Sequence, residues 1–275
     1  MQGYVILRDS FCILVNPTQS PNPMLFFKRI FNAAKGANAP REKRRTNRYA
    51  LNAAFPLRAV LSLTGRDNFG APLKASDNKG WDWKGQLVNL SSCGARIELP
   101  PAALAARGDD CHLKLTLDRY QLVIPSRVAH LREHRDHVVF GLELNLSEHQ
   151  TRQAYRQLVD LVALGASLKL VKNVRPDDSG YLVEQYGGKE DALLTVWRES
   201  AWQMVAAFEF KIKEYYIRGT AKNLKLKYFS AGPNKQLKPV APSMNPEMQR
   251  LFQWIVPNLT EAVPVDVQDF LKLHA

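Results

Sequence analysis

The chain has 275 residues, a length that fits one large domain or two modest ones. Its 45% hydrophobic and 23% charged residues are typical of a soluble globular protein with a real core. The formal net charge of +12 favours anionic partners, which include nucleotides, nucleic acids and acidic membrane surfaces, but it does not choose among them.

Cysteine content and hydropathy argue against two further classes of protein. The three cysteines are scattered and lack CxxC spacing, which argues against a disulfide scaffold and is typical of a reducing compartment. No run of about 18 apolar residues exists, so we expect no transmembrane segment. Arg8 and Asp9 interrupt the apolar run near the N-terminus, and no signal peptide is indicated. We therefore expect a cytoplasmic protein.

Residues 1–40 are predicted to form a leader and linker. Residues 16–23 are rich in Pro, Ser and Asn, which indicates a loop. Residues 24–31 (MLFFKRIF) are apolar and basic, and we expect them to pack on the fold rather than on a membrane or a partner. A basic run over residues 41–48 follows, and such a run is usually a solvated arm.

Beyond this arm the hydrophobic pattern changes to period two, which predicts antiparallel strands with one buried face. Five or six such strands in about 100 residues indicate a small barrel or sandwich. A surface loop is predicted over residues 66–79, and Trp81 and Trp83 are assigned to a loop that ends before Gly85. The predicted strands cover residues 57–63, 86–89, 95–99, 113–117, 122–124 and 138–144.

An amphipathic helix is predicted to close the barrel segment and to cover one mouth or side of it. Ser147 and Gln150 form an S-x-x-Q capping box at its start, and Gly165 is the expected stop. The apolar residues that recur at helical spacing on one face are Ala154, Tyr155, Leu158, Leu161 and Val162.

The remaining sequence returns to strand character and predicts a second, smaller β-rich unit with terminal helices. We therefore expect a barrel domain over residues 41–165 and a C-terminal domain of unknown type over residues 166–275. Partner binding, dimerisation and a degenerate second barrel stay open as roles for the C-terminal domain. The predicted strands are Leu168–Val174, Leu193–Trp197, Met204–Tyr216 and Leu224–Tyr228, and the predicted helices are Glu247–Val256 and Asp266–His274.

Two short motifs stand in a fixed order on this scaffold. Arg44–Arg48 is an R-x-x-x-R at the end of the basic arm, just before the first strand. Asn89–Gly94 is an N-x-S-x-x-G between one strand and the next. An R-x-x-x-R alone is weak, because Arg41–Arg45 is a second instance in the same run. The pair becomes informative only on the right scaffold.

The residue types of the two motifs fit a ligand that carries guanines and phosphates. An arginine guanidinium can donate two parallel hydrogen bonds to a guanine edge or fork onto a phosphate, and lysine cannot copy that planar geometry. Asn89 and Ser91 offer donors and acceptors, and alternate residues of a strand share a face. Gly94 lets the backbone turn or approach closely, where a Cβ would interfere.

Three blocks of the sequence resemble the opening, middle and closing parts of a PilZ domain, and together they span about 120 of the 275 residues. These blocks are KRRTNRYALNAAFPLRAVL, GQLVNLSSCGARIELP and FGLELNLSEHQTRQAYRQLV. The resemblance implies a six-stranded antiparallel β-barrel that binds cyclic di-GMP, with the number of ligand molecules left open. The ligand-binding residues that it implies are Arg44, Arg45, Arg48, Asn89, Ser91 and Gly94.

The resemblance predicts a receptor whose ligand orders the arginine arm and changes an interdomain or partner interaction, with motility, polysaccharide or biofilm control as outputs. We expect no catalysis, metal or cofactor, because no motif for any of them is evident. A protein partner of the output is expected, and a homodimer stays open. A nucleic-acid-binding barrel, or a scaffold whose barrel has lost its ligand, is the alternative. Nucleic acid is disfavoured, because the barrel segment lacks aromatics that alternate with basic residues.

Overall fold

The structure is a computed structural model, and it describes residues 47–64, 81–171, 179–232, 234 and 236–275. The leader over residues 1–40, and Arg44 and Arg45 of the arm, lie outside the described residues. The predicted loop over residues 66–79 also lies outside them. In the part of the chain that is described, no helix is long and apolar enough to span a membrane.

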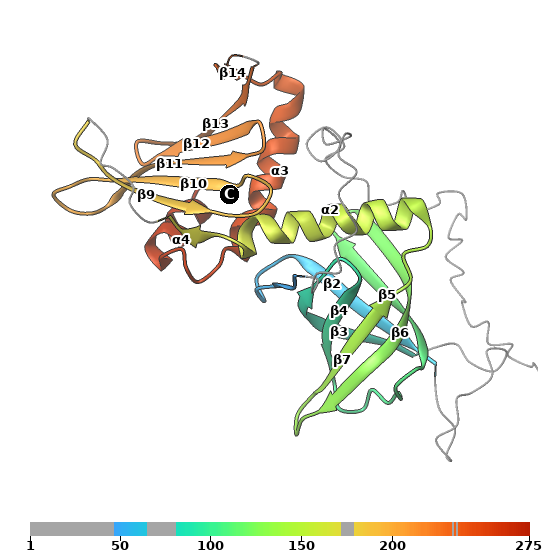
Figure 1. The fold of residues 1–275 in the computed structure, drawn as a ribbon. Coiled ribbons are helices and arrows are strands. Elements are labelled where there is room, and N and C mark those ends of the chain that lie inside the picture. Colours follow the sequence, from blue (N-terminus) through green and yellow to red (C-terminus); the bar gives the residue numbers. More distant parts are fainter. Residues whose placement is uncertain (1–46, 65–80, 172–178, 233, 235) are drawn as a thin grey trace, which may run out of the picture.

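The first sheet closes into a six-stranded antiparallel barrel, which confirms the fold predicted from the sequence (Figure 1). The strands follow the order β3-β2-β5-β6-β7-β4, and a β3–β4 pairing closes the ring. The short strand β1 adds to the free part of the β3 edge. The bounds are β1 Tyr49–Ala50, β2 Leu57–Leu63, β3 Trp81–Leu90, β4 Gly94–Leu99, β5 Asp110–Leu117, β6 Tyr120–Glu133 and β7 Val138–Leu144.

Alternation along each strand fills the barrel with leucine, isoleucine and valine. Leu61, Leu113 and Ile97 are fully buried, while their neighbours along each strand face outward. One sequence prediction is wrong here, because Trp81 and Trp83 lie on β3 and not in a loop. Their aromatic rings suit a strand, and the partners of Trp81 and Trp83 on β2 are Leu63 and Leu61.

The barrel segment ends in helix α2, His149–Ala166, which packs Tyr155 and Leu158 against the barrel core. The predicted capping box is wrong. The N-cap is Glu148 and carries no side-chain cap bond, while the Thr151 hydroxyl donates to Glu148 Oε2 at 2.7 Å. The observed N-cap lies one residue beyond the predicted one, because Ser147 still lies in the loop that leaves β7.

A second antiparallel sheet follows, and it is an open meander of seven strands in the order β14-β13-β12-β11-β10-β9-β8. The predicted strand Met204–Tyr216 is wrong, because it splits into the hairpin β11–β12. Lys213 makes that turn with a positive φ of 55°, and no Gly or Pro marks it in the sequence. The bounds are β8 Lys169–Leu170, β9 Leu182–Gly187, β10 Leu193–Arg198, β11 Val205–Ile212, β12 Tyr215–Thr220, β13 Asn223–Ala231 and β14 Leu237–Pro239.

Two α-helices and two single 3-10 turns complete the second unit. Phe208 on β11 stacks on Phe252 of α3 with ring centroids 5.4 Å apart, and it meets Phe270 of α4 edge-on. Arg198 of β10 is buried and pairs with Glu184 and Asp266, which ties α4 to the sheet. The bounds are η1 Pro242–Met244, α3 Asn245–Ile255, η2 Val256–Asn258 and α4 Val265–Lys272.

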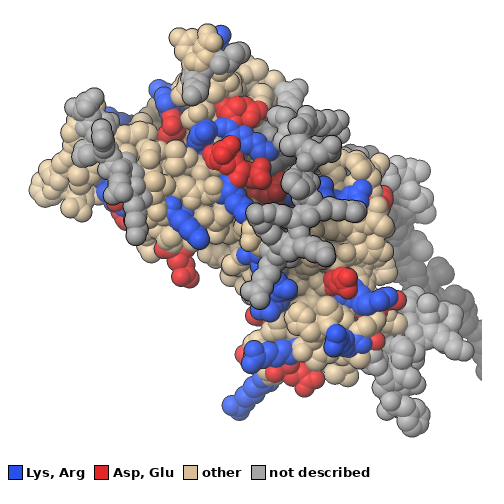
Figure 2. All heavy atoms as spheres, viewed as in Figure 1, with Lys and Arg blue, Asp and Glu red and all other residues tan. Residues whose placement is uncertain are grey.

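Helix α2 forms the seam between the barrel and the second unit. At Gly165 a Cβ would lie 2.7 Å from the Asn258 carbonyl oxygen and 3.0 Å from that of Ile255, so only glycine allows this approach. Charged side chains also gather where the second sheet meets α2 (Figure 2). Burial raises the pKa of Asp160 to about 6, and the Glu190 carboxylate acts in the same direction, against opposing cations that include Lys213.

We expect Gly165→Ala to lower the free energy of unfolding by about 1–2 kcal/mol. Alanine gains about 1 kcal/mol in helix propensity, but overpacking against rigid backbone costs about 1–3 kcal/mol. Urea denaturation of the full chain measures the difference. Gly232→Ala is the matched control, because its added Cβ would meet only ordinary contact. Equal stability of the Gly165 variant and the wild type would contradict the close approach.

We expect Asp160→Asn to stabilise the protein at pH 7 by about 1–2 kcal/mol and to leave it unchanged near pH 3.5. The folded-state pKa is raised from 3.8 to about 6, so the folded state binds the proton more tightly. Stability is therefore lost as the pH rises from about 4 to 6. Because Asp160 is only partly buried, the expected change in stability is about half of what the full pKa shift would give. Denaturation at both pH values measures the effect, with the exposed Asp191→Asn as control.

Candidate functional site

The N-x-S-x-x-G segment forms a tight turn between β3 and β4. The Ser91 amide donates to the Gly94 carbonyl oxygen at 2.9 Å, and the Ser91 hydroxyl donates to the same oxygen at 3.2 Å. Ser91 is 4% exposed, while Ser92 and Cys93 form the exposed tip. The hydroxyl predicted to face a ligand thus closes the turn, so the observed contribution of Ser91 is to fix the shape of the loop.

Helix α2 and strand β7 both contact this turn at Gly94. The Tyr155 hydroxyl donates to the Gly94 carbonyl oxygen at 3.0 Å, and Tyr155 is fully buried. Burial raises the pKa of Tyr155, so its hydroxyl remains a donor at neutral pH. A Cβ at Gly94 would lie 2.8 Å from the Leu142 carbonyl oxygen of β7. The glycine is therefore required for close packing of β4 on β7.

A β-bulge directs Asn89 away from the barrel core. The register between β3 and β4 shifts between Leu87 and Asn89, so Leu87 and Leu90 are both buried. Without the bulge, Asn89 would share the inward face with Leu87. The extra residue instead leaves Asn89 half-buried, outside the row of core residues. The strand thus presents an amide at the barrel surface immediately before the turn.

Asn89 belongs to a row of residues that crosses four strands on the outer face of the barrel. Asn89 pairs with Arg96 on β4, Arg96 pairs with Gly141 on β7, and His130 on β6 pairs with Gly141. The His130 ring occupies the space that a Gly141 side chain would fill. The row therefore combines an amide, a guanidinium and an imidazole on one surface strip.

Arg96 is the residue of this strip that the motif analysis missed. It is half-buried, and its Nε is buried without a hydrogen-bond partner among the described residues. An unsatisfied guanidinium donor marks a place where an acceptor would be stabilised. The signal was present in the sequence, because Arg96 shares the outward face of β4 with Gly94. The pairing of Arg96 with Asn89 could not be predicted from the sequence, because that pairing depends on the bulge in β3.

The arginine arm reaches this strip through β1. Tyr49 pairs with Leu90 and Ala50 pairs with Asn89, and the Leu51 amide donates to the Val88 carbonyl oxygen at 3.0 Å. Continuing this antiparallel register by one residue brings the exposed Arg48 level with Ser91. The structure thus places the backbone of Arg48 next in register to the Asn89–Gly94 segment. It does not test Arg44 and Arg45, which lie outside the described residues.

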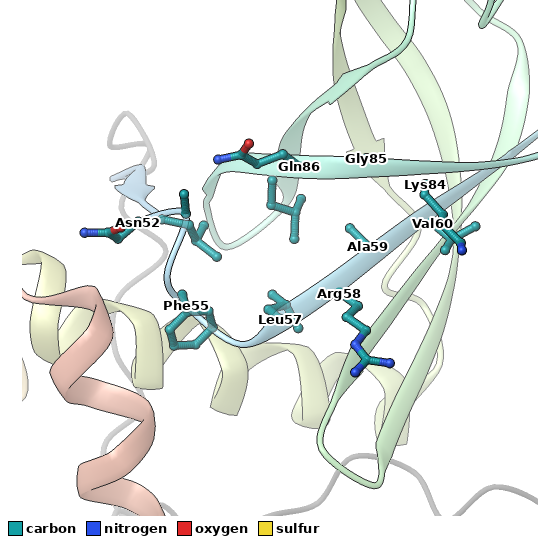
Figure 3. A pocket seen from close by; sticks show the side chains of 12 residues that line it. Asn52, Phe55, Leu57, Arg58, Ala59, Val60, Lys84, Gly85 and Gln86 are labelled. Atoms are coloured by element: carbon teal, nitrogen blue, oxygen red, sulfur yellow. The ribbon is translucent and has the colours of Figure 1, made fainter. Parts of the chain in front are cut away.

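A hollow of about 540 Å³ lies beside the same edge of β3 (Figure 3). β3 pairs with β2 as far as Gly85 and with β1 from Asn89, so the strand edge between them lacks a continuous partner strand. Residues 51–60 bridge this gap and leave the hollow between themselves and β3. Its polar side chains are Asn52, Arg58, Lys84 and Gln86.

Comparison with known proteins identifies the barrel segment. The model of the PilZ domain family matches residues 42–163. The PilZ domain of CeSA from a cellulose-synthesizing bacterium is 15% identical, with a TM-score of 0.30 over 42% of this chain and 96% of that one. The PilZ domain of YcgR from Escherichia coli, solved with c-di-GMP, is 12% identical, with a TM-score of 0.33 over 43% of this chain and 90% of that one. No curated protein matches the sequence.

The region that the family model matches is the region that folds as the closed barrel and α2. It contains the N-x-S-x-x-G turn and ends within α2. The second sheet and its helices lie beyond the matched residues. Residues 42–163 of the chain therefore match the PilZ domain family.

Proposed function

We propose that this chain is a receptor for cyclic di-GMP, which binds where the arginine arm meets the outer face of the barrel. The observation that carries the proposal is the pairing of β1 with the end of β3. In this pairing Tyr49, which directly follows the first motif in sequence, lies opposite Leu90 of the second motif. The match of residues 42–163 to the PilZ domain family, which includes known cyclic di-GMP receptors, supports the same ligand.

The chemistry of the strip fits a guanine dinucleotide. In this proposal Arg44, Arg45 and Arg48 fork onto guanine edges and phosphates, while Asn89 binds a guanine edge. Arg96 adds a donor whose Nε is unsatisfied within the described chain. The Ser91–Gly94 turn contributes its shape and its exposed backbone, as the family pattern implies. The receptor binds this ligand and performs no catalysis.

The output of the receptor is proposed to pass through the second unit, which lies beyond the family match. Ligand binding orders the arm, and the ordered arm favours one arrangement of the segments that contact it. The second unit then presents a changed surface to a protein partner in the cytoplasm. Motility, polysaccharide synthesis and biofilm formation are the processes that the family implies.

We expect wild-type protein to bind cyclic di-GMP with micromolar or tighter affinity in a calorimetric titration. Arg48→Ala should weaken binding by at least about tenfold, because a hydrogen bond to a charged group contributes about 1.5–3 kcal/mol. Arg48→Lys should also weaken it, because lysine keeps the charge and loses the fork. Arg135→Ala, at an exposed position in the β6–β7 turn, is the matched control and should bind as the wild type does. Absence of binding by the wild type would refute the receptor assignment.

The salt dependence of binding should separate a dinucleotide receptor from a nucleic-acid-binding barrel. Cyclic di-GMP carries two phosphates, so we expect its affinity to fall by less than about tenfold between 50 and 200 mM salt. A site that neutralises six to ten phosphates of a nucleic acid loses about 10³–10⁵ over the same range. Titrations of cyclic di-GMP and of a single-stranded oligonucleotide at both salt concentrations measure the contrast. Tighter binding of the oligonucleotide with a steep salt slope would favour the alternative.

A further inference from the structure

The chain that follows the arginine arm is held by a residue from outside the PilZ domain. Asn258 lies in η2, between the two C-terminal helices, and is 3% exposed. Its Oδ1 accepts a hydrogen bond from the Asn52 amide at 2.8 Å. Its Nδ2 donates to the Val162 carbonyl oxygen at 3.2 Å and to the Ala50 carbonyl oxygen at 3.4 Å. One side chain therefore joins the arm segment, helix α2 and the second unit.

An amide is required at this position, because its neighbours demand both an acceptor and a donor. The Asn52 N–H needs an oxygen, and the carbonyls of Ala50 and Val162 need an N–H. Aspartate would place a second oxygen against two carbonyls, and leucine would satisfy none of the three groups. Because Asn258 is buried, displacement of Ala50 and Asn52 would leave its amide with only the Val162 carbonyl among these partners.

A second contact joins the arm and the second unit close to the first. Lys189, in the β9–β10 turn, places its Nζ 5.1 Å from the centroid of the Tyr49 ring. Tyr49 directly follows Arg48 and pairs with Leu90, the second residue of the N-x-S-x-x-G segment. Lys189 also acts electrostatically on Asp160 of α2. The second unit thus contacts both residues of β1: Lys189 contacts Tyr49, and Asn258 contacts Ala50.

We propose that Asn258, assisted by Lys189, is a positioning residue for the cyclic di-GMP site. This inference rests on the proposed receptor function and adds a residue outside the family match to the control of that site. Within the described part of the chain, the hydrogen bonds of the Asn258 side chain go to Asn52, Ala50 and Val162 and not to a proposed ligand-binding residue. It fixes Ala50 and Asn52, and β1 in turn holds Arg48 beside the Ser91–Gly94 turn. Coupling between two sites is reciprocal, so ligand binding at the arm must also tighten the hold on Asn258.

The test compares ligand affinity in full-length Asn258→Ala with that in Gln268→Ala. Gln268 is the matched control, because its amide bonds the carbonyls of Thr260 and Val263 within the second unit and does not touch the arm. At a temperature where both variants are folded, we expect Asn258→Ala to weaken cyclic di-GMP binding by about tenfold. Gln268→Ala should stay within about twofold of the wild type.

Lys189→Gln keeps the inference testable if Asn258→Ala does not fold, because Lys189 is exposed. Loss of its cation–π contact should weaken binding by about two- to fivefold. Hydrogen exchange supplies the readout that a purely structural role would not move. Ligand should slow exchange over residues 256–260 and at Asn52 in the wild type, and this slowing should be absent in Asn258→Ala.

The outcomes separate the two proposals. If the wild type binds and Asn258→Ala binds with unchanged affinity, the positioning role is refuted and the receptor function is not. If Asn258→Ala does not fold, unchanged affinity in Lys189→Gln has the same meaning. Equal loss in Asn258→Ala and Gln268→Ala overturns it too, because general destabilisation of the second unit then explains the effect. No binding by the wild type refutes the receptor function and the positioning role together.

Discussion

The pairing of Tyr49 and Ala50 with the end of β3 is the contact on which the candidate site depends. A two-residue strand has little stability of its own, so its position must come from neighbouring contacts. The Leu51 amide, the Asn258 side chain and the Lys189 cation supply them. If this pairing is lost, the chain that directly follows Arg48 is no longer fixed beside Asn89 and Leu90.

Much of this fold could be predicted from local pattern, and the failures have local causes. Period-two alternation found the barrel strands, because each buries one face in a closed core. It failed at Lys213, where a hairpin turn carries no Gly or Pro and both flanks alternate. It failed again at Trp81 and Trp83, whose neighbouring Gly and Asn residues indicate a loop. Ser147 met the capping pattern, but the chain enters the helix two residues later.

Only the motif residues of the candidate site could be proposed from the sequence. Arg48, Asn89 and Gly94 stand out in the sequence because their spacing is fixed by local geometry. Arg96 joins them through a bulge, and Asn258 joins them across more than 200 residues of chain. Neither a bulge register nor a buried amide between units leaves a periodic signal. A sequence pattern can therefore suggest candidate ligand-binding side chains more readily than it predicts what holds them in place.

This geometry suggests different roles for the barrel and for the second unit. A tightly packed barrel changes shape little, so a ligand bound to its rigid face alone would transmit little to the rest of the chain. The segment over residues 49–52 is different, because the contacts that hold it come from the second unit, and a ligand bound beside it could compete with or reinforce them. Ligand contacts on the barrel supply affinity in this scheme, while the arm converts affinity into a conformational preference. In the proposed scheme the second unit senses the ligand, because Asn258 and Lys189 hold the segment that directly follows the arm rather than the barrel wall.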